Sequence, residues 1–186
     1  MRFRCDLRIR HEDGRWAQTR EIGKVMCRTA TTVSLRYPGS EHKLHESIVM
    51  IDGEEWFDDG LLGYVDEDGF LFLTGREKEM IISGGVNLYP VEIETVILLH
   101  PAVFDCAVVR LPHPDLGEVP IACVLLHEGK QATGEEIIEF LKGQGLKGYK
   151  IPAQIDFFDE LPRHIYGKII KRELEELYWK DETAVG

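Results

Sequence analysis

The stretch LGYVDEDGFLFLTGREKEMIISGGVNLYPVEIE, residues 62–94, changes its pattern in the middle and thereby indicates how the chain is organised. In its first half, Asp68-Gly69 lies between apolar runs, which is a hairpin signal, and the apolar segment 70–73 follows as a strand. In its second half the pattern becomes that of mixed α and β structure. We therefore predict a β-rich first part and an α+β second part, with the boundary near 75–78.

Toward the N-terminus the chain reads as β structure. Residues 7–10 alternate apolar and polar side chains, a turn follows at Asp13-Gly14, and residues 23–28 resume a strand. Residues 48–51 form a further short strand, and residues 36–40 predict a loop before it.

Toward the C-terminus, helices alternate with strands. Pro90 can open a helix to about Leu99, because the first turn of a helix leaves its N–H groups unbonded and proline has none. Thr133 and Glu136 predict a capping box at the start of a second helix, which runs to Gly143. The remaining predicted elements are strands over 106–111, 119–127 and 155–158 and an amphipathic helix over 168–179. The expected fold class is α/β, of the α+β type, with domains 1–75 and 76–186.

Composition narrows the classes of function. The 22 Lys and Arg residues and 33 Asp and Glu residues give 22 − 33 = −11, and the pI is near 5.1. We expect no nucleic-acid partner, because binding a polyanion needs a basic face. The apolar runs are far shorter than the ~20 residues of a membrane-spanning helix, so we expect no membrane span. Four dispersed cysteines and an N-terminus without an apolar run predict a cytoplasmic protein with free, buried thiols.

Two features of the middle of the chain could carry chemistry. Gly84-Gly85 follows an apolar strand, and a glycine pair there would allow a ligand to approach the backbone closely. A tight strand-to-helix connection is the simpler interpretation. Residues 76–79 could supply a ligand contact through Arg76 and a hinge at Lys78, or could be a charged linker.

The third feature is Lys168, which follows a turn that contains proline and glycine. Such a turn could hold an ammonium group against a phosphate or carboxylate oxygen on which charge develops. Without that role, Lys168 would be an ordinary surface lysine at the start of a helix, where the helix dipole disfavours a cation. Lys171 and Arg172 could be further cations of the same site or the solvated face of the helix.

Two long motifs resemble one known family. Residues 62–94 closely resemble the core motif of the AMP-forming acyl-CoA synthetases and adenylation domains, the adenylate-forming superfamily that includes firefly luciferase. Residues 158–174 resemble the final motif of the same family. The resemblance implies that residues 1–75 are a β-rich remnant of the family's N-terminal domain and that residues 76–186 are its C-terminal lid domain.

The family's chemistry implies a role for each matching position. The implied reaction converts a carboxylic acid, ATP and CoA into acyl-CoA, AMP and pyrophosphate through an acyl-adenylate, with Mg²⁺ bound together with the N-terminal domain. The matching residues are Lys168 as the catalytic lysine, Arg76 and Asn87 at the nucleotide, Lys78 at the hinge, and Gly84 and Gly85 along the pantetheine channel. The resemblance places no metal ligand in this chain.

The chain departs from the family pattern at several positions. Leu61 stands where the family usually has an aspartate that grips the ribose hydroxyls, and a leucine cannot accept a hydrogen bond. Asp58 or Asp59 could substitute after a local shift of the chain. His164, Ile165 and Tyr166 stand where small or hydroxyl residues are usual; these are the residues between Arg163 and Gly167.

The family's phosphate loop, a Ser/Thr- and Gly-rich segment that ends in Lys-Gly, and its acyl-pocket motifs do not occur in this sequence. The resemblance therefore implies an N-terminal adenylation domain as a partner, in a longer chain or as a separate chain, and a fragment that is inactive alone. Two alternatives remain open: a fragment of a peptide-synthetase adenylation domain, and a non-catalytic interaction module that retains the lid fold.

Overall fold

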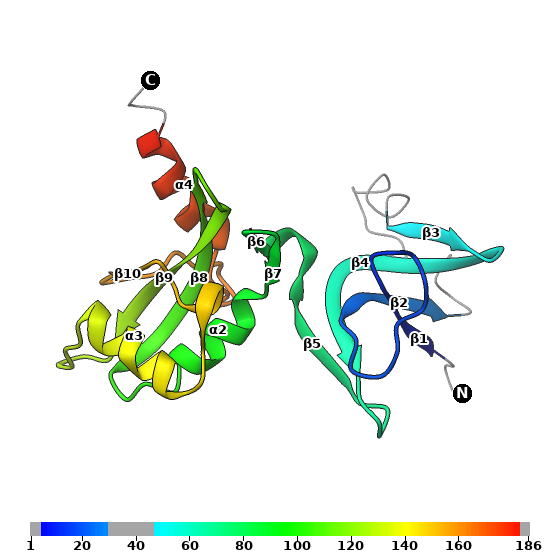
Figure 1. Cartoon of the computed structure of the whole chain (residues 1–186), viewed down its shortest axis with the longest axis horizontal. Helices are drawn as coiled ribbons and strands as arrows, with labels where there is room; N and C mark the ends of the chain where they lie inside the picture. The colour runs from blue at the N-terminus through cyan, green and yellow to red at the C-terminus, as the bar shows by residue number, and fades with distance from the viewer. Residues whose placement is uncertain (1–4, 30–46, 183–186) are drawn as a thin grey trace. The chain divides into compact units, whose positions relative to one another are not determined.

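A computed structural model describes residues 5–29 and 47–182 and divides the chain into two compact units, Met1–Lys78 and Glu79–Gly186 (Figure 1). We call these the N-terminal unit and the C-terminal unit. The predicted first part ends at Gly75, whereas strand β5 (Leu71–Arg76) continues past that residue and the first unit extends to Lys78. The predicted loop at 36–40 lies outside the described residues.

The described strands of the N-terminal unit form one antiparallel sheet. They are β1 (Cys5–Arg10), β2 (Gly23–Thr29), β3 (Ile48–Ile51), β4 (Glu54–Val65) and β5, in the order β1-β2-β4-β3, with β5 paired to β4. The strands predicted from the sequence are confirmed with small changes of bounds. Most of the acidic run 52–60, which the sequence pattern left unassigned, lies in β4, because Trp56 within it is 1% exposed and packs with Met26 and Ile51.

Strand β4 is distorted around Gly60. This glycine has φ +67° and donates its N–H to Asp58 Oδ1 at 2.8 Å. The pairing with β2 slips at the same point, since Lys24 lies opposite Leu62 whereas Met26 lies opposite Asp58. A bulge of this kind changes the direction of the side chains beside it.

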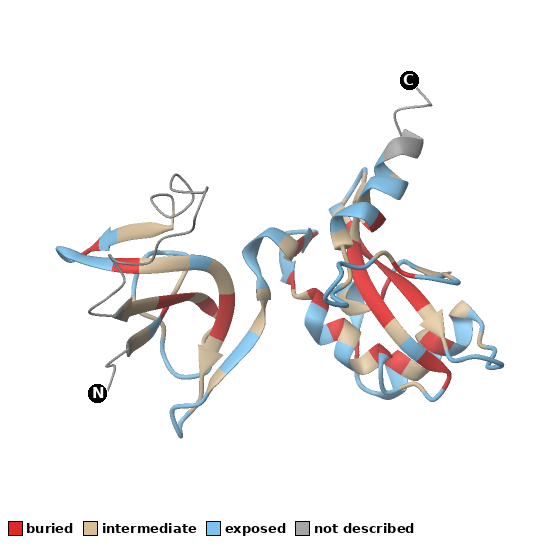
Figure 2. Ribbon diagram, turned by 180° about the vertical axis from the view of Figure 1, so that it is seen from behind, coloured by how far each residue is buried: buried red, intermediate tan, exposed pale blue. Residues whose placement is uncertain are grey.

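The C-terminal unit is a mixed sheet with helices. Its strands are β6 (Ile81–Ser83), β7 (Val86–Leu88), β8 (Val103–His113), β9 (Gly117–Leu126) and β10 (Gln154–Phe157), and its helices are α2 (Pro90–Ile97), α3 (Gly134–Gly143) and α4 (Lys171–Glu182). The sheet order is β10-β9-β6-β7 with β8 also on β9, and β10 runs parallel to β9. Buried residues follow β8 and β9 through the middle of this unit (Figure 2).

Alternation along β8 and β9 gives the sheet two apolar faces. Cys106 and Val108 belong to a core that α2 and α3 cover, whereas Ala107 and Val109 belong to a second core with Leu174 of α4. This separation follows from the strand geometry, in which successive side chains point to opposite faces. The expected α+β class, with an antiparallel β part followed by the lid fold, is confirmed.

Helix α4 begins at Lys171, not at Lys168 as the sequence pattern predicted. The residues before it are held in a loop by an isolated bridge between Arg163 and Ile169 and by a hydrogen bond from the Ile170 N–H to the Pro162 carbonyl at 2.8 Å. Lys168 therefore lies in a loop and not in the first turn of a helix. The amphipathic pattern places Leu177 on the apolar side of the predicted helix, but this side chain is 52% exposed.

Two expectations from composition can be compared with this fold. Cys106 and Cys123 are free and buried, as predicted, whereas Cys27 is only partly buried, so the prediction of burial is wrong for that residue. Within the described ranges, no helix combines the length and the apolar character needed to cross a lipid bilayer.

Candidate functional site

Lys168 lies in a tight loop between β10 and α4. The Gly167 N–H donates to the His164 carbonyl at 2.8 Å, and the His164 N–H donates to the Lys168 carbonyl at 2.9 Å. Gly167 has φ +85°, a conformation that glycine adopts without strain. Ile165 and Tyr166 form the tip, each 91% exposed. The loop thus projects an apolar tip with Lys168 directly after it.

The Lys168 side chain is exposed, and no described residue forms a hydrogen bond or an ion pair with it. Lys171 differs, because its Nζ lies 2.7 Å from Glu94 Oε1 and 3.4 Å from Glu79 Oε2, in a side chain that is 18% exposed. These contacts are ion pairs without good hydrogen-bond geometry. Of the two lysines, only Lys168 is available to a ligand.

Gly84 and Gly85 form the turn of a β-hairpin between β6 and β7, and not a strand-to-helix connection. Their φ angles of +55° and +80° suit a two-residue turn that reverses a right-twisted strand. The two glycines differ in their surroundings. A Cβ on Gly84 would lie 3.2 Å from the ring of Tyr149, whereas a Cβ on Gly85 would have no heavy atom within 4 Å.

Tyr149 therefore covers one side of the glycine turn and leaves the other open. It lies in a short 3-10 helix (Gly148–Lys150) and is 45% exposed. Asn87, on β7 opposite Ile82, is exposed on the same hairpin. Sequence reasoning did not single out Tyr149, since an aromatic residue between glycine and lysine carries no signal of its own; its role is visible only in its contact with Gly84.

Arg76 and Lys78 belong to the N-terminal unit. Arg76 ends β5, and its guanidinium lies 3.7 Å from Asp59 Oδ2 and donates to the Asp59 carbonyl at 3.4 Å. Lys78 is exposed, in a short 3-10 turn (Glu77–Glu79). The residue before it, Glu77, pairs with Lys24 at 2.8 Å.

The Lys24 ammonium also lies 3.6 Å from Asp58. Burial lowers the pKa of Lys24, but Glu77 and Asp58 more than offset this effect and raise the pKa above its usual value. Asp58 is thereby engaged by Lys24 as well as by the Gly60 N–H, and its side chain is 15% exposed. The Asp59 side chain is 49% exposed and is therefore the more accessible of the two carboxylates. Leu61, half-buried on β4, is paired with Arg76 across the strands.

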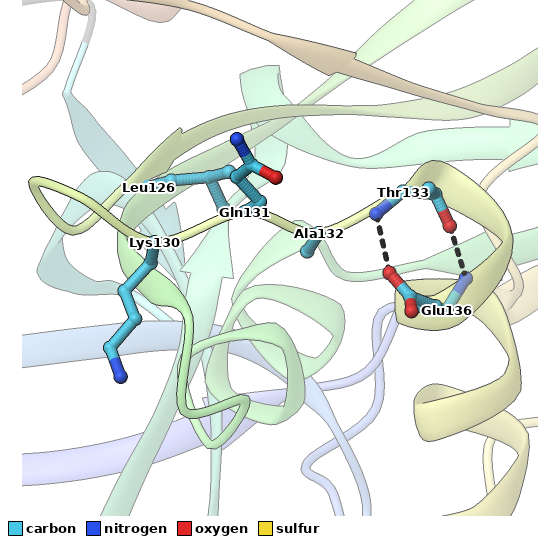
Figure 3. A pocket seen from close by; sticks show the side chains of 6 residues that line it. All are labelled: Leu126, Lys130, Gln131, Ala132, Thr133 and Glu136. Carbon is cyan, nitrogen blue, oxygen red and sulfur yellow. Dashed lines mark hydrogen bonds between the residues drawn. The ribbon is translucent and has the colours of Figure 1, made fainter.

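A pocket beside the start of α3 does not contain these residues (Figure 3). It is lined by Leu126, Lys130, Gln131, Ala132, Thr133 and Glu136. Two of these side chains are already used, because Thr133 and Glu136 bond each other's backbone N–H groups in the predicted capping box. The described residues also hold no group of three or more His, Cys, Asp or Glu side chains that could bind a metal ion.

Comparison with known proteins decides which family these features belong to. Residues 92–168, which end at the exposed lysine, match the family described as AMP-binding enzyme C-terminal domain. Residues 92–168 are similar to the C-terminal domain of AMP-binding enzymes. The resemblance inferred from the chain's two motifs is therefore confirmed by a match to the C-terminal domain of AMP-binding enzymes.

Two curated relatives illustrate the similarity. The 2-succinylbenzoate–CoA ligase of Bacillus mycoides (strain KBAB4) is 39% identical over 175 residues, which are 94% of this chain and 34% of that protein. The fatty acid–[acyl-carrier-protein] ligase ScoC of Streptomyces coeruleorubidus is 38% identical over 171 residues, which are 92% of this chain and 32% of that protein. The chain thus spans about a third of the length of the curated relatives it matches.

Solved structures of adenylate-forming enzymes share the fold. ATP-bound MatB from Rhodopseudomonas palustris superposes with a TM-score of 0.80 at 31% identity, covering 94% of this chain and 34% of that one. A second structure is the o-succinylbenzoate CoA synthetase MenE from Bacillus subtilis in complex with the acyl-adenylate intermediate OSB-AMP. It has a TM-score of 0.78 at 34% identity, and the match covers 92% of this chain and 34% of that one. Because both matches cover most of this chain, the similarity includes both units.

Proposed function

We propose that this chain is the C-terminal part of an ATP-dependent ligase that joins a carboxylic acid to CoA and forms AMP. The observation that carries the proposal is Lys168, an exposed ammonium without a partner among the described residues, on a tight loop of an AMP-binding C-terminal domain. The phosphate loop and the acyl pocket would come from an N-terminal adenylation domain, in the same longer chain or in a partner chain. Residues 1–75 would be the last, β-rich subdomain of that domain, and the chain would be inactive alone.

In the first half-reaction, a carboxylate oxygen of the acid attacks the α-phosphorus of ATP, and pyrophosphate leaves. Lys168 would donate hydrogen bonds to the oxygens on which negative charge grows, a task suited to a compact ammonium group. Mg²⁺ would be held by the nucleotide phosphates and the N-terminal domain, since the described residues supply no cluster of metal ligands. The product is an acyl-adenylate.

Arg76 and Asp59 would hold the nucleotide. Leu61 cannot accept hydrogen bonds from the ribose hydroxyls. In the distorted strand β4, however, the Asp59 carboxylate lies beside the Arg76 guanidinium. Asp58 is less suitable because Lys24 and Gly60 already occupy it. Asn87 would lie near the adenylate.

We expect Asp59→Asn to raise the KM for ATP about tenfold, since one charged hydrogen bond is worth roughly 1.5–3 kcal/mol. Glu55→Gln, an exposed carboxylate on the same strand, should leave that KM unchanged.

In the second half-reaction, the thiol of CoA attacks the acyl-adenylate and AMP leaves. Gly84 and Gly85 would line the channel for the pantetheine arm, and Lys78 would be the hinge about which the lid turns between the two steps. The open space at Gly85 supports this assignment, because a slim chain could pass where no Cβ intrudes.

Lys168→Ala tests the first step in the longer protein. We expect acid-dependent pyrophosphate exchange to fall by orders of magnitude, while thioester formation from supplied acyl-adenylate persists. Arg172→Ala is the matched control, since Arg172 is a neighbouring cation whose side chain is 82% exposed. An equal loss in both steps would refute the role of Lys168.

Gly85→Leu tests the second step, with Gly85→Ala as a control that carries the same backbone strain at φ +80° without the bulk. The leucine should slow CoA-dependent turnover and spare pyrophosphate exchange. Unchanged turnover with CoA would count against a channel at this turn.

For these assays the first acid to supply is 2-succinylbenzoate, the substrate named in the curated ligase of Bacillus mycoides. A cytoplasmic location is proposed as well, because buried free thiols fit a reducing compartment.

Leu61 favours a second candidate, a non-catalytic interaction module that retained the lid fold. Calorimetry of this chain with ATP and with CoA, together with an activity assay of a longer protein, separates the two candidates. The proposed ligase predicts that the 186-residue chain alone binds neither ligand and that a longer protein containing it is active. A longer protein without acid-dependent pyrophosphate exchange would favour the interaction module.

A further inference from the structure

Besides its backbone hydrogen bonds, the loop that carries Lys168 is fastened by the side chain of Arg163. Arg163 Nη1 donates to the Gly167 carbonyl at 2.9 Å, and Arg163 Nη2 donates to Asp105 Oδ2 at 2.5 Å. One guanidinium therefore joins the first part of the loop to its last part and fastens both to β8. The Arg163 and Asp105 side chains are 32% and 27% exposed, so solvent screens this pair only in part.

Asp105 reaches Arg163 because β8 contains a bulge. Val103 pairs with Leu126 and Asp105 pairs with Leu125, which leaves Phe104 as the extra residue on β8. Val103 belongs to the core under α2 and α3, whereas Ala107, two residues beyond Asp105, belongs to the core under α4. In a regular strand Val103 and Asp105 would share a face. The bulge instead turns Asp105 to the face on which the loop and α4 pack.

A second hydrogen bond holds the carboxylate still. Asp105 Oδ1 accepts the N–H of Cys106 at 2.8 Å, so the side chain is oriented before Arg163 binds the other oxygen. The far end of the loop is held too, since Lys171 pairs with Glu94, whose Oε1 accepts the Val108 N–H at 2.7 Å. Both ends of the loop are thus anchored to β8, and Lys168 lies between the anchors.

We infer that Arg163, fixed by Asp105, is a positioning residue for Lys168. The inference rests on the proposed function of Lys168 and assigns it a brace within the C-terminal unit itself. A lysine has a flexible stem, so the reach of its ammonium depends on where the loop holds its backbone. Arginine suits the task because its planar fork meets two acceptors at once.

The test measures kcat and the KM for ATP of pyrophosphate exchange in the longer ligase. Asp105→Asn and Arg163→Lys should each lower kcat about 10- to 100-fold, since a displacement of about 1 Å at a reacting group can cost 10²-fold. The KM for ATP should change less than about twofold, because neither residue is assigned to nucleotide binding; a merely structural defect would not separate kcat from KM in this way. Glu176→Gln, which removes an exposed ion pair with Arg172 on α4, should change neither constant.

Hydrogen exchange in the present chain gives a readout without activity. Asp105→Asn should speed exchange of the His164 and Gly167 amides and leave the amide of Val108 in β8 protected. If Val108 also loses protection, Arg163→Lys replaces that variant, because it keeps a cation for Asp105 and removes only the fork.

The outcomes separate the two hypotheses. A normal kcat in Asp105→Asn and Arg163→Lys, with Lys168→Ala impaired, would overturn the brace and leave the proposed function intact. Normal exchange of pyrophosphate in Lys168→Ala would overturn the proposed function and this inference with it.

Discussion

Lys168, Lys171 and Arg172 are neighbours in the sequence, yet each has a different environment. Lys168 is exposed and has no partner among the described residues, Lys171 is paired with Glu94, and Arg172 is 82% exposed beside Glu176. An exposed pair of this kind contributes little to stability. Arg172 therefore belongs to the solvated face of α4. Lys171 is neither on that solvated face nor free to act as a further cation of the site.

The buried thiols give a prediction at the scale of single residues. Burial raises the pKa of the Cys123 thiol to about 11 and raises the pKa of Cys106 further. At pH 8 only about one Cys123 thiol in a thousand would be the reactive thiolate. We expect neither cysteine to be alkylated by iodoacetamide at pH 8 in the folded chain and both to be alkylated in guanidinium chloride. Mass spectrometry of the peptides measures this, and rapid native labelling would contradict the burial.

Gly63 gives a second prediction. A Cβ at this position would lie 2.5 Å from the Phe72 carbonyl oxygen, which is backbone and cannot move aside easily. Gly63→Ala should therefore destabilise the N-terminal unit by about 1–3 kcal/mol, the usual cost of overpacking. Gly143→Ala, at the end of α3 with no atom within 4 Å, is the control and should be neutral or slightly stabilising. Urea unfolding measures both, and equal midpoints would be inconsistent with a close contact at Gly63.

At the scale of elements, the start of α3 depends on its capping box (Figure 3). Glu136 N–H donates to Thr133 Oγ1 at 3.2 Å, and Thr133 N–H donates to Glu136 Oε2 at 2.8 Å. Thr133→Ala should lower the free energy of unfolding of the C-terminal unit by about 0.5–2 kcal/mol. Thr133→Ser keeps the oxygen and should cost much less. If the two variants are equally unstable by urea unfolding, the loss does not come from the cap.

The element that differs most from its predicted form is α4. The apolar periodicity of residues 168–179 is compatible with a helix throughout, but the bridge between Arg163 and Ile169 gives the first residues another conformation. The backbone groups of Ile170 and His164 find their partners inside the loop instead of in a helical turn. This pairing joins residues on opposite sides of the Gly167 turn, so no helical periodicity could report it.

At the scale of the whole molecule, each unit has its own core, and the chain crosses between them at Lys78 and Glu79. We predict that the units unfold independently. In a Trp179→Phe variant the remaining indoles, Trp16 and Trp56, both belong to the N-terminal unit, so fluorescence reports that unit alone. Alkylation of Cys123 reports the C-terminal unit. We expect the two probes to give different urea midpoints. Coincident unfolding transitions would contradict the independent unfolding of the two units.

The features that the sequence predicted best are those with short-range causes. The hairpin at Asp68-Gly69 is confirmed between β4 and β5, where Asp66 Oδ1 accepts the N–H groups of Asp68 and Phe70. The capping box of α3 is confirmed for the same reason, since both partners lie within one helical turn. The acidic first part of β4 was not predicted, because its residues carry no apolar alternation and its burial depends on Trp56 packing against other strands.

The sequence by itself determined the fold class, the family and the position of Lys168, since each is written in contiguous motifs whose hydrogen bonds and apolar spacing are local. Only the tertiary structure decided that Gly84 is covered by Tyr149, that Asp59 lies beside Arg76, and that the Lys168 loop is fastened to β8. Each of these contacts joins distant parts of the chain, and two of them depend on bulges in β4 and β8. The one-residue bulge in β8 changes the face that the side chains beside it occupy, and the place of each irregularity is set by the pairing of whole strands.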